Sequence, residues 1–136
     1  MRLSRLTAQA VGALVGCALF ALPSYAIDLT GLWATQDAPC DKMFVKEGNE
    51  FSLRRDADLY GGGFIIEGSR IKAPTATCTI KSRSEEADIV HLFAACSTEI
   101  MFSNVQLSLR VIDANKISRI FPGMPDMKLT YVRCSL

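Results

Sequence analysis

Short segments of alternating polar and apolar residues recur along most of the chain after its first 30 residues. The clearest is 105–112, in which the apolar residues occupy every second position: Val105, Leu107, Leu109 and Val111. A period of two residues is typical of a half-buried β-strand, and no segment has the 3.6-residue period of an amphipathic helix. Eight to ten such strands joined by turns predict an all-β fold, either a sandwich or a closed barrel.

Turn residues predict how neighbouring strands connect. The expected hairpins, in chain order, are 43–46 with 51–55, 64–67 with 70–73, and 75–83 with 88–96. Polar residues at 84–87 are expected to form the turn of the third hairpin. We expect 100–103 to be a short strand, separate from 105–112.

The first 26 residues have the parts of a secretory signal peptide. Arg2 and Arg5 precede an uncharged apolar run at 6–22, and small residues at Ser24 and Ala26 predict cleavage after Ala26. The run is short for a membrane-spanning helix, so retention as an anchor is the weaker interpretation.

A second processing route competes with this cleavage. The segment that ends in Cys17 resembles a bacterial lipobox, so the alternative is a lipoprotein anchored through Cys17. Contact with a membrane is expected only in that case. In either case we exclude 1–26 from the fold, treat 27–136 as a single domain, and expect a periplasmic or secreted protein.

Four cysteines follow the signal peptide: Cys40, Cys78, Cys96 and Cys134. An even number in an exported chain predicts two disulfides, with three possible pairings. Cys78 and Cys96 flank the expected 84–87 turn, so their strands should be neighbours. First and last strands meet in a closed barrel, which favours Cys40–Cys134 as the second bridge.

The charge of the chain argues against nucleic acid as a partner. Two of the 15 Lys and Arg residues are Arg2 and Arg5, so 13 remain after residue 26, against 14 Asp and Glu. The formal charge is therefore near −1, with no basic patch, and nucleic acid is an unexpected partner.

No group of residues predicts catalysis, a metal or another cofactor. His91 is the only histidine, and neither Ser97, Ser103 nor Glu99 has a spacing that makes it a catalytic partner. The acidic residues at 85–88 lack the glycine and ligand spacing of a calcium loop. Methionine is a copper ligand, but no histidine lies beside the methionines in the sequence. We therefore expect a protein that is not an enzyme.

Gly31 and Trp33 form a G-x-W pair near the start of the mature chain, and Arg133 lies in the expected last strand. This arrangement resembles lipocalins and their calycin relatives, in which an arginine near the last strand lies across the tryptophan ring. With Cys40 soon after Trp33, it is also similar to small periplasmic inhibitors of the alkaline-protease-inhibitor type. The resemblance implies a calycin-like antiparallel barrel of about eight strands. Those inhibitors have one disulfide, and their inhibitory segment precedes the barrel, whereas only 27–29 precede this Gly31 strand.

Two functions of different class follow. Phe121, Met124 and Met127 make an apolar loop with two prolines, a composition typical of a protein-contact surface. Together with the segment ahead of Trp33, this loop would bind an envelope or secreted protein such as a protease. The alternative is a carrier for a small apolar ligand held under a rim at 61–63, with a cavity of at least ~300 Å³.

Overall fold

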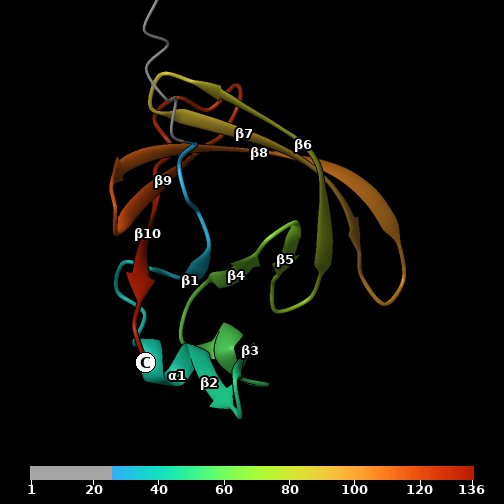
Figure 1. Ribbon diagram of the computed structural model, residues 1–136, viewed down its shortest axis with the longest axis vertical. Helices are drawn as coiled ribbons and strands as arrows, with labels where there is room; N and C mark the ends of the chain where they lie inside the picture. Colours follow the sequence, from blue (N-terminus) through green and yellow to red (C-terminus); the bar gives the residue numbers. More distant parts are fainter. Residues whose placement is uncertain (1–25) are drawn as a thin grey trace, which may run out of the picture.

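Eight antiparallel strands close into a barrel in the computed structural model, which describes residues 26–136 (Figure 1). Around the barrel the order is β1 (Gly31–Thr35), β10 (Leu129–Cys134), β9 (Lys116–Ile120), β8 (Phe102–Asp113), β7 (Ile89–Ser97), β6 (Thr77–Glu86), β5 (Arg70–Lys72) and β4 (Gly63–Glu67). The predicted all-β antiparallel barrel is confirmed. Of the predicted signal peptide at 1–26, residues 1–25, including Cys17, lie outside the described residues.

Strand β1 closes the barrel by pairing on both sides. Trp33 lies opposite Arg133 of β10 on one side and opposite Phe64 of β4 on the other. Closure gives every barrel strand two neighbours, but β6 pairs with β5 only at 77–79, and its outer part pairs with β7 alone. Among residues 26–136, no helix is long and apolar enough to cross a membrane.

Both disulfides have the predicted pairing. Cys40–Cys134 joins the start of α1 (Cys40–Met43) to the end of β10, with a Cα–Cα distance of 5.7 Å. Cys78–Cys96 joins directly opposed residues of β6 and β7, with a Cα–Cα distance of 4.0 Å. The two bridges therefore tie α1 to the last barrel strand and cross-link the β6–β7 hairpin.

The expected 43–46/51–55 hairpin forms, but outside the barrel. Its strands β2 (Phe44–Glu47) and β3 (Glu50–Leu53) make a separate two-stranded sheet. With α1 and the short 3₁₀ helix η1 (Ala57–Leu59), they lie below the barrel in Figure 1. This layer buries an apolar cluster against the outer faces of β1, β4 and β10: Leu32, Ala34, Ala38, Met43, Phe44, Ala57, Ile65 and Cys134.

Two expectations about the long strands were wrong. The polar 84–87 segment is not a turn, because Ser84, Glu85 and Glu86 continue β6 and the chain turns only at Ala87 and Asp88. These side chains are polar because they are exposed in the outer part of a long hairpin. The separation of 100–103 from 105–112 was also wrong, because β8 runs without a break from Phe102 to Asp113.

Side chains fill the middle of the barrel. Six interior residues are at most 1 % exposed: Trp33, Val90, Leu92, Ala94, Leu109 and Ile117. A void large enough for water would leave exposed surface on the side chains around it. Side chains therefore fill the barrel interior around these six residues, as expected for a small barrel.

Candidate functional site

The G-x-W pair and Arg133 form one packed unit. The Arg133 guanidinium lies 4.3 Å from the centroid of the Trp33 ring, and the indole Nε1 donates a hydrogen bond of 2.8 Å to the Leu29 carbonyl. Gly31 has a φ of +144°, and a Cβ there would lie 2.5 Å from Arg133 Nη1. The glycine therefore leaves the space that the guanidinium occupies over the indole.

Arg133 also holds the N-terminal segment against the barrel end. Its Nη1 donates to the Thr30 carbonyl, and its Nη2 donates to the Asp28 carbonyl at 3.2 Å. Its Nε donates to the carbonyl of Ala114, in the β8–β9 turn, at 3.0 Å. One side chain thus connects β10 to two other parts of the chain.

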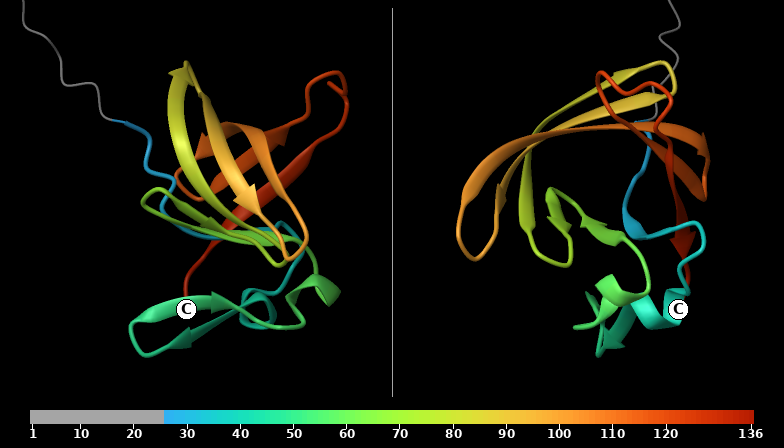
Figure 2. Two further views of the ribbon diagram at one scale, coloured as in Figure 1. Left: turned by 90° about the vertical axis from the view of Figure 1, so that its right-hand side faces the viewer. Right: turned by 180° about the vertical axis from the view of Figure 1, so that it is seen from behind.

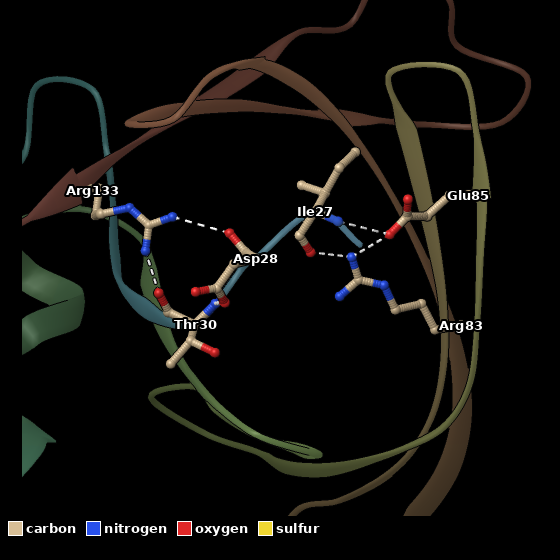
Figure 3. Close-up of polar contacts among 6 residues, drawn as sticks. All are labelled: Ile27, Asp28, Thr30, Arg83, Glu85 and Arg133. Atoms are coloured by element: carbon tan, nitrogen blue, oxygen red, sulfur yellow. Dashed lines mark hydrogen bonds and ion pairs between the residues drawn. The ribbon is translucent and has the colours of Figure 1, made fainter. Parts of the chain in front are cut away.

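The opposite end of this segment is held by β6. The Ile27 backbone N donates to Glu85 Oε1 at 3.0 Å, and Arg83 Nη2 donates to the Ile27 carbonyl. Arg83 also pairs with Glu85 at 2.5 Å. Figure 3 shows residues 27–30, which we call the N-terminal brace, crossing the barrel end between Arg133 and the Arg83–Glu85 pair.

Two carboxylates of this region are held in the charged form. The hydrogen bond from Arg83, followed by that from the Ile27 N–H, lowers the pKa of Glu85. Hydrogen bonds from Thr30 lower the pKa of Asp28, with smaller contributions from the charges of Arg133 and Arg83. The brace is thus a charged network that holds the backbone of 27–30 against the barrel end.

The predicted contact loop joins β9 to β10. Met124 and Met127 are 50 % and 51 % exposed. Phe121 is half-buried, with the Arg119 guanidinium 4.8 Å from its ring centroid. The loop therefore offers two separated methionines.

A more exposed apolar surface lies at the tip of the β7–β8 hairpin. Ile100, Met101 and Phe102 are 91 %, 56 % and 89 % exposed. Figure 2 shows this hairpin tip (98–102) projecting from the barrel, well away from the β9–β10 loop. A groove of about 760 Å³, open to solvent, separates the tip from the β5–β6 loop at 73–77.

Sequence reasoning missed this tip as a site. The available signal was a run of three apolar residues directly after the turn-forming Ser97, Thr98 and Glu99. A short strand was expected at 100–103, whereas in the structure Ile100 lies in the turn before β8 and Phe102, the first residue of β8, is 89 % exposed.

The three glycines at 61–63 do not form a rim. A Cβ at Gly61 would lie 2.7 Å from Thr35 Oγ1, and one at Gly63 would lie 2.7 Å from the Trp33 carbonyl oxygen. The Gly62 N–H donates to Thr35 Oγ1 at 3.2 Å. These glycines let the chain pass close beside β1 as it re-enters the barrel.

His91 has partners that the sequence did not indicate. Its Nδ1 lies 2.8 Å from Ser108 Oγ, and its Nε2 lies 3.5 Å from Glu86 Oε2. The three residue types match a hydrolase triad, but Ser108 is buried on a sheet face, where the nearby N–H groups are used in pairing β7, β8 and β9. Such a face supplies no free donors for an oxyanion. Within residues 26–136, no three His, Cys, Asp or Glu side chains are grouped to hold a metal ion.

The described residues form an all-β barrel with two disulfides. A closed eight-stranded antiparallel barrel is consistent with a calycin-like fold, and two disulfides are compatible with an extracellular or periplasmic location. Searches against family models, curated proteins and solved structures find no match to this chain.

Proposed function

We propose that this protein is an exported, non-enzymatic binding module that attaches to another protein of the envelope or secretion space through its hairpin tip. The observation that carries the proposal is the exposure of Ile100 and Phe102, at 91 % and 89 %. Large apolar side chains exposed together typically mark a contact surface. Such residues, seated in a partner's pocket, supply most of the energy of an interface.

Charge favours a protein with a concave apolar site over a lipid surface. Glu99 is the only charged residue between Leu92 and Leu109, and 73–80 across the groove carries no charge. Segments that bind anionic membranes carry Lys and Arg beside their apolar residues, and the tip has none.

The shape of the tip favours a different protein over a second copy of this chain. Two narrow tips in contact would bury less than the roughly 800 Å² per partner of a stable interface. A concave partner would contact both the tip and the flanking 73–77 loop, and so reach that area.

Export rests on the signal peptide and is part of the same proposal. We infer cleavage after Ala26, with lipidation of Cys17 as the alternative. Mass spectrometry of the native N-terminus separates the two, because the first leaves Ile27 and the second leaves an acylated Cys17.

The small-ligand carrier has weaker support. The filled barrel centre at Trp33, Val90 and Ile117 leaves no space there for an apolar molecule. Solvent-open grooves of about 410 and 760 Å³ lie at the brace and beside the tip, but they are surface features. Fluorescent fatty-acid titration tests this function, and saturable binding at one site would favour it.

Binding through the tip is tested with matched surface variants. Envelope extract is passed over the mature protein and over the double variant Ile100→Ser/Phe102→Ser. The control is Leu59→Ser, because Leu59 is 77 % exposed on η1, outside the barrel. A second variant, Met124→Ser/Met127→Ser, tests the β9–β10 loop.

We expect one protein to be lost with the tip variant and retained with Leu59→Ser. The purified partner should then bind the tip variant at least about tenfold more weakly, since burying one such side chain contributes about 1.5–3 kcal/mol. Equal binding by the tip variant, loss only with the methionine variant, flotation with lipid vesicles or tip-dependent dimerisation would each overturn the proposal.

A further inference from the structure

The N-terminal brace ends at Ile27, the residue that cleavage after Ala26 would expose. Both backbone polar groups of Ile27 are bonded to β6: the N donates to Glu85 Oε1 at 3.0 Å, and the carbonyl accepts from Arg83. Ala26 itself is exposed. Among the described residues, the hydrogen bonds from the N-terminal segment to β6 are thus made by the residue directly after the predicted cleavage site.

We propose that Arg83 and Glu85 form a binding site for the α-ammonium group of Ile27, created when the signal peptide is removed. Hydrolysis of the Ala26–Ile27 bond by a signal peptidase consumes one water. The water oxygen bonds to the Ala26 carbonyl carbon as the C–N bond breaks, which leaves a carboxylate on the released peptide, and both water protons go to the Ile27 nitrogen, which becomes an ammonium group. The inference rests on the export part of the proposed function and is independent of the hairpin tip.

The geometry needs no rearrangement for this exchange. Glu85 Oε1 already accepts a hydrogen bond from the Ile27 nitrogen, so the ammonium group occupies a donor position that the amide N–H held before. A hydrogen bond between two charged groups is shorter and about twice as strong as a neutral one. Cleavage therefore strengthens the contact that holds the brace to β6.

Glu85 is the carboxylate that contacts the Ile27 nitrogen, and the same Oε1 also accepts from Arg83. Asp28 accepts from the Thr30 N–H at 2.9 Å and lies near Arg133 and Arg83. Arg83 shares Glu85 with the ammonium group, but it also donates to the Ile27 carbonyl, so both cations keep a partner. Maturation thereby fastens the brace across the barrel end.

Two chains with defined first residues test the site, one beginning at Ile27 and one that retains Ala26. All the strands, both disulfides and both apolar clusters lie after Ala26, so both chains contain the whole fold. Glu85→Gln is made in each. The control is Glu86→Gln, whose side chain is 80 % exposed and whose one ion pair within residues 26–136 is with His91, at 3.5 Å.

In the chain that begins at Ile27, Glu85→Gln should lower Tm by about 1–4 °C, as expected for a partly exposed ion pair. In the chain that retains Ala26 the decrease should be at most about half as large, and Glu86→Gln should have no such dependence on the first residue. The Ile27 amine should also react more slowly with an amine reagent in the wild-type chain than in Glu85→Gln. Equal Tm decreases in both chains, or an Ile27 amine that reacts equally fast with and without the Glu85→Gln change, would refute the site whether or not the tip binds a partner.

Discussion

Replacing Arg133 by alanine should destabilise the barrel more than replacing any surface arginine. Arg133 donates to the carbonyls of Asp28, Thr30 and Ala114 and lies 4.3 Å from the Trp33 ring. The variant removes all of these contacts together. It frees the N-terminal brace on the β10 side and uncovers one face of the indole.

The expected loss follows from these contacts. The bonds to Asp28 and Ala114 have ordinary lengths of 3.2 and 3.0 Å, and together they contribute about 1–2 kcal/mol. The guanidinium over the indole contributes about 1 kcal/mol more. We therefore expect Arg133→Ala to lower the free energy of unfolding by about 2–3 kcal/mol, and Tm by about 8–12 °C at about 4 °C per kcal/mol.

Urea denaturation with both disulfides intact measures this loss. Trp33 is the only tryptophan, so its fluorescence reports the barrel end directly. Arg133→Lys should recover about half of the loss, because an ammonium group keeps the charge but lacks the planar fork that reaches several carbonyls. The matched control is Arg110→Ala, since Arg110 is half exposed and, in the described part of the chain, forms one ion pair, with Asp88 at 3.5 Å. If Arg133→Ala cost no more than the control, at about 0.5 kcal/mol, the packed unit of Gly31, Trp33 and Arg133 would not be a source of stability.

Three further predictions concern the same framework. Gly31→Ala should lower Tm, because the new Cβ would lie 2.5 Å from Arg133 Nη1 and a φ of +144° strains an L-residue. A double-mutant cycle by thermal denaturation should show that part of this loss disappears in the Arg133→Ala background. Asp28 and Glu85 have lowered pKa values, so their contribution to stability is fully present above their ordinary pKa near 4 and is lost as the pH falls through the lowered values. The Tm difference between wild type and Asp28→Asn/Glu85→Gln should therefore shrink steadily as the pH falls below about 5, and a constant difference would contradict this. Removal of the Cys40–Cys134 bridge, which spans 94 residues, should lower the free energy of unfolding by about 4–5 kcal/mol, against about 3 kcal/mol for the 18-residue Cys78–Cys96 bridge. Urea denaturation of the paired Cys→Ala variants measures both losses, and the reverse order would oppose the loop-entropy argument.

The sequence was informative where a local pattern has one structural solution. Alternation in 105–112 predicted the buried side of β8, and Leu109 is 1 % exposed there. The disulfide pairing was predictable because a closed barrel brings its first and last strands together, and Cys134 lies opposite Leu32 of β1. The pairing was thus a consequence of topology, which the strand pattern and the G-x-W resemblance supplied together.

Other features depend on contacts that no local pattern encodes. Phe51 and Leu53 alternate as they would in a barrel strand, yet they pack in a cluster outside the barrel. Helix α1 has only four residues, too few to display a helical period. Ser84 to Glu86 are polar because the long β6–β7 hairpin exposes them, and a polar run of this length is equally typical of a turn.

The candidate site was the least predictable part. Exposure of Ile100 and Phe102 depends on how far β7 and β8 extend beyond their neighbours, which is a property of the assembled sheet. The N-terminal brace depends on Arg83 and Glu85 lying 56 and 58 residues from Ile27. Neither residue carried a signal that set it apart from other exposed charges.

Photo-crosslinking in the living cell tests the proposed contact most directly. A photoreactive amino acid is placed at Met101 in the hairpin tip or at Ile112 near the opposite end of β8; the two native side chains are 56 % and 53 % exposed. The account predicts a covalent adduct with one envelope or secreted protein from position 101 and none from position 112. No adduct from position 101, or the same adduct from both positions, would contradict it.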